Sequence, residues 1–207
     1  MNVNYHKLCI EEINKLDSPK HILLHSCCAP CSSYVISFLS NYFNITILYY
    51  NPNIAPQEEY EKRKQEQIKL IKTINTKYKL DFLDCDYENN IYNNLIQGHE
   101  NALEGGTRCH ICFKLRLEKT AQLAKKYNYE YFCSTLTVSP HKNSKIINEI
   151  GESISKKYNI KWLYSDFKKN EGFKQSNELS KKYDLYRQDY CGCIFSKQQK
   201  NKQEIVN

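Results

Sequence analysis

The chain has 207 residues, of which 41% are hydrophobic and 13% aromatic, and this composition excludes an intrinsically disordered protein. Thirty basic and 23 acidic residues give a net charge of +7, which suits a polyanionic partner such as RNA, although lysine-rich surfaces are common without one. The sequence has no apolar run of about eighteen residues and no signal-peptide core, so we expect a cytoplasmic protein that makes no membrane contact.

In chain order, short apolar runs alternate with longer amphipathic stretches, after a first short helix that we expect over residues 7–18. The apolar runs predict strands over residues 22–24, 44–50, 79–85, 129–134 and 160–164. The stretches that follow predict helices over residues 30–39, 57–73, 87–96, 108–126, 144–157 and 172–182, and from Ile194 onward. Strands that alternate with helices indicate a parallel sheet, so we expect one α/β domain over residues 1–207, with a C-terminal helical segment at about 170–207 that carries the last two cysteines.

Three cysteines follow the first predicted strand, in the stretch HILLHSCCAPCSS. They are Cys27, Cys28 and Cys31, and the next helix begins among them at Pro30. Ligands of open α/β sheets bind outside the carboxyl ends of the strands. A helix N-terminus also stabilises anions, including thiolates. These three thiols are therefore placed for chemistry.

A second group, Cys109 and Cys112, opens a predicted helix as a C-x-x-C motif after a pair of glycines. Ten cysteines in a reducing compartment argue for metal or redox roles rather than a disulfide framework. If the first and second groups converge, they form a four-cysteine site with one thiol to spare, which suits zinc or an iron–sulfur cluster. A structural zinc site is the alternative, although vicinal cysteines with an extra thiol are more typical of an open reactive centre.

The third group is Cys191-Gly192-Cys193. Two cysteines separated by one glycine can form a small, strained disulfide that is easily reduced; the alternative is a pair of unrelated buried thiols. The remaining cysteines are expected in the core.

Polar residues follow several of the predicted strands and indicate a polar pocket at one edge of the sheet. We single out Asn51 after the second strand, and His141 and Lys142 after the fourth. The stretch YDLYRQDY, which contains Arg187 and Tyr190, can stack on a base and hydrogen-bond to it; the alternative is a solvated loop.

The chain resembles the cobalamin-independent epoxyqueuosine reductase family (QueH) from about residue 20 to 195. The motifs that carry the resemblance are HSCCAPCSS, TRCHICFKLRLEKTA, STLTVSPHKNS and GFKQSNELSKKYDLYRQDYCGC, in this order. The resemblance implies a Rossmann-like fold of the ATP-pyrophosphatase (HUP-like) type, a parallel sheet of about five strands with helices on both faces. Cysteines occupy the place of the phosphate loop in those enzymes, so we expect neither ATP nor cobalamin as a cofactor.

The resemblance also implies a function and an assignment of residues. The epoxide of epoxyqueuosine, at the wobble position of tRNA, is reduced to an alkene in the last step of queuosine synthesis, with electrons from a donor that the sequence does not identify. A [4Fe-4S] cluster is implied on Cys27, Cys28, Cys109 and Cys112, and a redox-active pair on Cys191 and Cys193. Cys31, the spare thiol, is assigned to catalysis or to a second metal ion, iron or zinc, beside the cluster. The residues expected to contact the substrate are Arg187, Tyr190, His141, Lys142 and Asn51.

Two other functions remain open on the residues alone. One is a zinc-stapled RNA-binding module without catalysis, and the other is a dithiol oxidoreductase that uses only Cys191 and Cys193. The second leaves the other five grouped cysteines unexplained.

Overall fold

The computed structural model describes residues 3–206, and the side chains of residues 3–201. Its centre is a five-stranded sheet in the order β3-β2-β1-β4-β5, and all neighbouring strands pair in parallel. The strands are β1 (Lys20–His25), β2 (Phe43–Leu48), β3 (Leu80–Leu83), β4 (Tyr131–Ser134) and β5 (Lys161–Trp162). This order matches the doubly wound fold, with a switch point between β1 and β4, and confirms the predicted Rossmann-like class.

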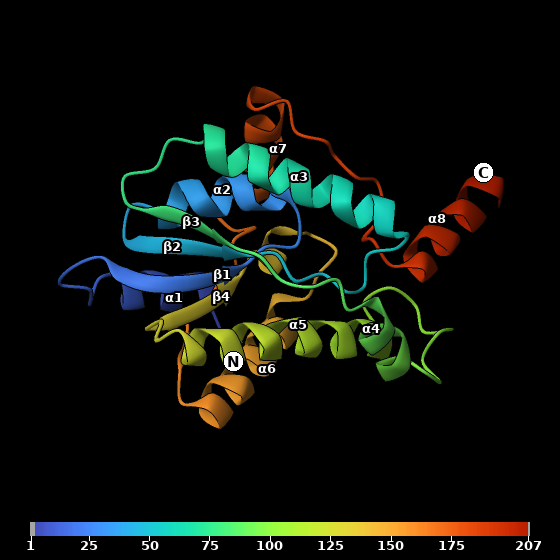
Figure 1. Ribbon diagram of the computed structural model, residues 1–207, viewed down its shortest axis with the longest axis horizontal. Coiled ribbons are helices and arrows are strands. Elements are labelled where there is room, and N and C mark those ends of the chain that lie inside the picture. Colours follow the sequence, from blue (N-terminus) through green and yellow to red (C-terminus); the bar gives the residue numbers. More distant parts are fainter. Residues whose placement is uncertain (1–2, 207) are drawn as a thin grey trace.

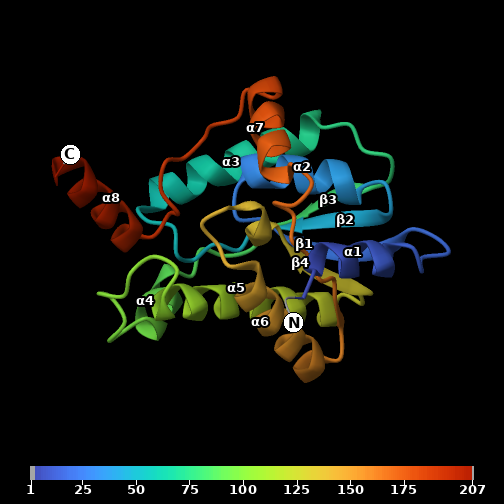
Figure 2. The same ribbon diagram turned by 180° about the vertical axis from the view of Figure 1, so that it is seen from behind.

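Helices cover both faces of the sheet, as predicted (Figures 1 and 2). One face carries α2 (Ala29–Leu39), α3 (Gln57–Thr73) and α7 (Gly172–Lys182), and the other carries α5 (Thr107–Lys126) and α6 (Ser144–Tyr158). The shorter elements are α1 (Tyr5–Ile13), α4 (Asn89–Leu95), the 3-10 helix η1 (Thr135–Val138) and α8 (Ile194–Val206). None of the helices in the described part of the chain has both the length and the apolar composition needed to cross a bilayer.

The central strand β1 is buried on both faces. Ile22, Leu23 and Leu24 are completely inaccessible to solvent, and alternate residues pack into the two separate cores on either side of the sheet. A strand covered on both faces has a continuous apolar sequence rather than an alternating one. This burial explains why the run before the first cysteines is apolar throughout.

Several predicted elements are shorter than the sequence pattern suggested, among them β3, β4 and α4, and for two others a local cause is visible. The first helix ends at Ile13 rather than at residue 18, because a turn over Asp17 and Ser18 leads directly into β1. The fifth strand has two residues, because the backbone N–H of Ser165 donates to the Asn148 side chain (3.0 Å) instead of to a neighbouring strand.

The replacement Gly151→Ala is expected to lower the melting temperature. A Cβ atom at Gly151 would lie 2.3 Å from Cε2 of Trp162, whose indole N–H is held by Asn148 at 3.0 Å. Overpacking of this kind costs about 1–3 kcal/mol of unfolding free energy. Thermal denaturation measures the effect, with Ser153→Ala, an exposed change on the same helix, as the control. Equal melting temperatures for the two variants would contradict the predicted clash.

Candidate functional site

The first three cysteines meet at the carboxyl end of β1. The sulfur atoms of Cys27, Cys28 and Cys31 all lie within 4.8 Å of one another. Cys27 and Cys28 are buried, while Cys31 is half-buried. Among the described side chains, Cys109 and Cys112 do not belong to this tight group. The sequence therefore predicted the grouping of the first three thiols, and the structure places the C-x-x-C motif as a separate group.

Buried polar side chains fix the turn that carries these thiols. The hydroxyls of Ser26 and Ser32 both lie within hydrogen-bond distance of Oε1 of Gln67, at 2.5 and 2.8 Å. Cys28 occupies the N-cap position of α2, and its carbonyl accepts the Ser32 N–H at 3.0 Å. The sulfur atoms consequently surround a helix N-terminus, which favours negative charge.

The environment of the three thiols distinguishes Cys27 from its neighbours. Hydrogen bonds from the thiols of Cys28 and Cys31 hold the pKa of Cys27 well below its ordinary value. The hydroxyl of Thr135 adds a third donor, 3.3 Å from the same sulfur. The interaction with Cys27 raises the pKa of Cys28 to about 12, and it also raises the pKa of Cys31. Cys27 is thus the one thiol of the three whose pKa its neighbours lower.

The C-x-x-C motif lies in the first turns of α5, as predicted. The sulfur of Cys109 accepts the backbone N–H of Gly105 at 3.2 Å, and Gly105 adopts a positive φ of 89°. Cys109 packs against the same core cluster that contains Cys27 and Cys28. Cys112 packs instead with Cys193 in a small separate cluster. The motif therefore adjoins both other cysteine groups.

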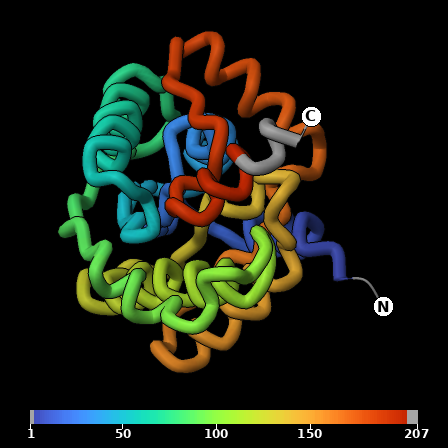
Figure 3. The backbone as a smooth tube through the Cα atoms, turned by 90° about the vertical axis from the view of Figure 1, so that its right-hand side faces the viewer, coloured from blue at the N-terminus to red at the C-terminus, as the bar shows by residue number. Residues whose placement is uncertain are grey.

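Residues 186–193, here called the C-terminal strap, cross the carboxyl edge of the sheet (Figure 3). The backbone N–H of Ala55 donates to the Gly192 carbonyl at 3.0 Å, and Arg63 donates to the Cys191 carbonyl at 3.3 Å. Gly192 has a φ of 127°, and a Cβ there would lie 2.9 Å from Ile54. The position requires glycine, which explains the CGC spacing.

Cys191 adjoins both of the other cysteine groups. A cavity of about 530 Å³ is lined by Cys191 together with Cys27, Cys28 and Cys31. A second hollow of about 20 Å³ is lined by Cys191 and Cys109. All ten cysteines lie in the described residues, and each is a free thiol in this structure, Cys191 and Cys193 included. A larger groove of about 740 Å³ beside β3 contains a single cysteine and no grouped thiols, so the cysteine-lined cavity is the candidate site.

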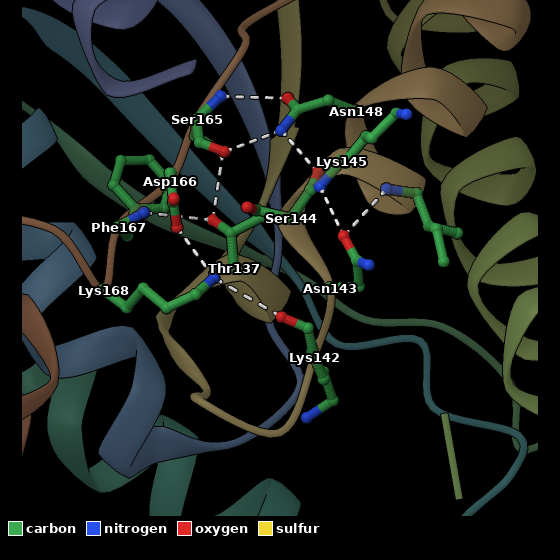
Figure 4. A network of polar contacts seen from close by, with 11 residues as sticks. Thr137, Lys142, Asn143, Ser144, Lys145, Asn148, Ser165, Asp166, Phe167 and Lys168 are labelled. Carbon is green, nitrogen blue, oxygen red and sulfur yellow. Dashed lines mark hydrogen bonds and ion pairs between the residues drawn. The ribbon is translucent and has the colours of Figure 1, made fainter. Parts of the chain in front are cut away.

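The loop that carries His141 and Lys142 lines the cavity, and a hydrogen bond from Lys168 connects it to the chain after β5 (Figure 4). Lys168 donates to Asp166 at 2.8 Å and to the Lys142 carbonyl at 3.4 Å. The Lys142 side chain points away from this network and lines the cavity. Burial alone would lower the pKa of Lys142, but its position near the sulfurs of Cys191 and Cys27 raises it. The site thus holds a fixed positive charge beside the thiols.

The predicted substrate residues divide into two sets. Arg187, Tyr190 and His141 line the cavity, as does Lys142. Asn51 is 1% exposed and is absent from the cavity lining, because its side chain donates to the Ser26 carbonyl at 2.8 Å and accepts from an arginine. Contact with substrate therefore stays a prediction for all five residues. Asn51 lies behind the residues that line the cavity and contacts Ser26 and Arg116.

Sequence reasoning missed two buried arginines. Arg63 pairs with Glu59 at 2.6 Å and holds the strap, while Arg116 lies one helical turn after Cys112 and lines the cysteine cavity. A signal for Arg116 was present, because it occupies an otherwise apolar face of a helix that begins with two cysteines.

A family model described as epoxyqueuosine reductase QueH matches residues 22–199. A protein named epoxyqueuosine reductase QueH from Streptococcus pyogenes serotype M1 is 45% identical over 177 residues, which cover 84% of this chain and 69% of that protein. A protein of the same name from Staphylococcus epidermidis is 41% identical over 202 residues, which cover 94% and 84%. Among solved structures, a predicted subunit of tRNA methyltransferase from Methanocaldococcus jannaschii is similar, with a TM-score of 0.49, 15% identity and coverage of 79% and 74%.

Proposed function

Because this chain belongs to the epoxyqueuosine reductase QueH family, we propose that it reduces the epoxide of epoxyqueuosine in tRNA to the alkene of queuosine. The observation that carries this proposal is a single cavity in which Cys191 of the strap adjoins Cys27, Cys28 and Cys31. The reaction takes up two electrons and two protons, and the epoxide oxygen leaves as water. A cavity lined with thiols and cations suits this chemistry.

We assign a [4Fe-4S] cluster to Cys27, Cys28, Cys109 and Cys112. The donor set fits, since iron–sulfur clusters are held by cysteine thiolates, and Cys109 packs against the core cluster that contains Cys27 and Cys28. When bound, the cluster would supply electrons one at a time. Cys31 lies within 4.8 Å of two proposed ligands, which supports its assignment to catalysis or to a second metal ion, iron or zinc.

The redox pair of the proposal is Cys191 and Cys193. Hydrogen bonds hold both residues to Ser196, whose hydroxyl accepts the Cys191 N–H at 3.2 Å and whose N–H donates to the Cys193 sulfur at 3.4 Å. Closure of this dithiol to a disulfide releases two electrons and two protons, which match the two electrons and two protons that one epoxide reduction takes up. An electron donor must then restore the dithiol.

The tRNA is proposed to bind over the strap, where the substrate residues surround the cavity. Arg187 is exposed, and its guanidinium lies 5.8 Å from the ring centre of Phe173. The ring of Tyr190 already has Arg63 over it, at 4.9 Å from the centroid. Because Lys197 also lies over this ring, at 5.6 Å from the centroid, a splayed base would stack on Arg187.

The replacement Arg187→Ala is expected to reduce turnover of epoxyqueuosine-containing tRNA by about tenfold, since one stacking and phosphate-binding group is lost. Iron content should stay unchanged. Steady-state rates at two salt concentrations measure the effect, and Lys182→Ala, which removes an exposed charge from α7, is the control. A wild-type rate for Arg187→Ala would identify it as a surface residue without a role in binding.

The decisive experiment incubates the anaerobically purified protein with epoxyqueuosine-containing tRNA and a reductant, and then analyses the tRNA nucleosides. Queuosine in place of epoxyqueuosine supports the proposal. A colourless, zinc-containing protein that leaves the tRNA unchanged would instead support an RNA-binding module without catalysis.

A further inference from the structure

Arg116 is a buried cation that has no acidic partner. Its side chain is on α5, it is 2% exposed, and in residues 3–201 no carboxylate lies within ion-pair distance of it. Its Nε donates to the Cys112 carbonyl at 3.2 Å and its Nη1 to Oδ1 of Asn51 at 3.4 Å. The Nη2 atom is buried and has no hydrogen-bond partner among the described residues. A buried guanidinium in this state requires a compensating anion.

The comparison with Arg63 shows that a buried arginine at this edge of the sheet can have an acidic partner. Arg63 is equally buried, but Glu59 lies 2.6 Å from its Nε and neutralises it. Both arginines face the cysteine-bearing edge of the sheet from helices on opposite faces. Arg108 is also buried and, among the described residues, also has no carboxylate within ion-pair distance, but of these two arginines only Arg116 lines the cysteine cavity.

Several sulfurs lie around Arg116, and although Glu104 and Asp189 also line the cavity, neither is within ion-pair distance of Arg116. It lines the same cavity as Cys27, Cys28, Cys31 and Cys191. Its Nε also contacts the carbonyl of Cys112, so its surroundings include Cys112, Cys191 and Cys27. These three cysteines come from three separate segments of the chain, so the guanidinium lies among all three cysteine groups.

The position of the guanidinium is fixed by its neighbours. The Asn51 amide donates to the Ser26 carbonyl at 2.8 Å, which turns its oxygen toward Arg116. The Arg116 carbonyl accepts the Thr120 hydroxyl at 2.7 Å within the helix. Because Nη2 is inaccessible, a tRNA phosphate cannot reach it in this arrangement, and a buried sulfur anion is the favoured partner.

We propose that Arg116 is the counter-charge of the sulfur centre, a positioning residue that stabilises its reduced, more negative state. The proposal rests on the cluster assigned above. Net charge and hydrogen bonding around an iron–sulfur cluster set its reduction potential. A fixed guanidinium favours the uptake of an electron, so its removal should make reduction harder.

The test measures the midpoint potential of the iron-loaded protein in a redox titration. In Arg116→Gln we expect a lower potential, such that the ratio of reduced to oxidised cluster at a fixed potential falls by about tenfold. Arg116→Lys, which keeps the charge, should retain most of the wild-type potential. Lys114→Gln removes the same charge from an exposed position of the same helix and should match the wild type.

Several outcomes would overturn the proposal. One is a midpoint potential in Arg116→Gln that equals that of the wild type. If that variant also binds tRNA more weakly and with less dependence on salt, Arg116 binds a tRNA phosphate instead. If Arg116→Gln does not retain iron, the iron content of Arg116→Lys is compared with it. Equal loss of iron in both variants would show that the shape of the arginine side chain, and not its charge, is required. An active wild-type protein without iron would refute the assigned cluster itself, whereas an iron-loaded wild type with an unaffected variant refutes only the role of Arg116.

Discussion

Replacement of Cys27 by serine is expected to abolish epoxide reduction and to remove most of the bound iron. Loss of an outer-shell contact to a metal site costs about 10–100-fold in affinity or activity, so loss of a ligand should exceed that range. Cys27 also accepts hydrogen bonds from Thr135 and two neighbouring thiols, which lower its pKa. Iron content, visible absorption and turnover are the measurements.

The matched control is Cys85→Ser, because Cys85 is a half-buried thiol of the separate groove beside β3. Cys109→Ser should resemble Cys27→Ser, and unchanged iron in Cys109→Ser would contradict the ligand set. Cys31→Ser tests the assignment further, since its sulfur lies within 4.8 Å of those of both Cys27 and Cys28. Iron lost in Cys31→Ser but kept in Cys109→Ser would move the cluster to the first cysteine group.

The double variant Cys191→Ser/Cys193→Ser is expected to keep its iron and to lose repeated turnover. The two thiols are outside the proposed ligand set, so the visible absorption should persist. Without the dithiol the electron pair of each reduction has no store within the protein, so we expect multiple-turnover rates to fall by about 100-fold or more, as for the loss of a chemical participant.

Single-turnover and multiple-turnover assays on epoxyqueuosine-containing tRNA separate this defect from a defect in binding. The control is Ser196→Ala, which removes the hydroxyl that holds the Cys191 N–H but leaves both thiols in place. Full multiple turnover by the double variant with a physiological reductant would refute the dithiol role.

The sequence predicted the sheet and its helices well, because burial on both faces leaves a clear pattern. The apolar run before Cys27 corresponds to β1, and Gln57–Thr73 is a helix with the predicted bounds. The short length of β5 could not be predicted. The strand ends early because the backbone N–H of Ser165 donates to the side chain of Asn148, which lies on α6. Such competition depends on the tertiary contacts between α6 and the chain after β5.

The cysteine groups of the site were predictable from the sequence, but their positions relative to one another were not. Spacing indicated a tight cluster of thiols after β1 and a second pair at the start of a helix, and both are present. That Cys191 adjoins both groups depends on the path of the strap across the sheet, a long-range contact that leaves no local pattern. The inward position of Asn51 also follows from its partners, Ser26 and Arg116, which are distant in sequence.

The path of the strap has a consequence for how the protein matures. All four proposed cluster ligands precede the strap in the chain, and a ribosome completes them before it reaches Gly192. Until the strap docks against Ala55 and Arg63, the carboxyl edge of the sheet lacks the segment that crosses it. A nascent chain would therefore expose the four proposed ligands before its dithiol is synthesised, so the order of synthesis would allow the proposed cofactor to bind before the site closes.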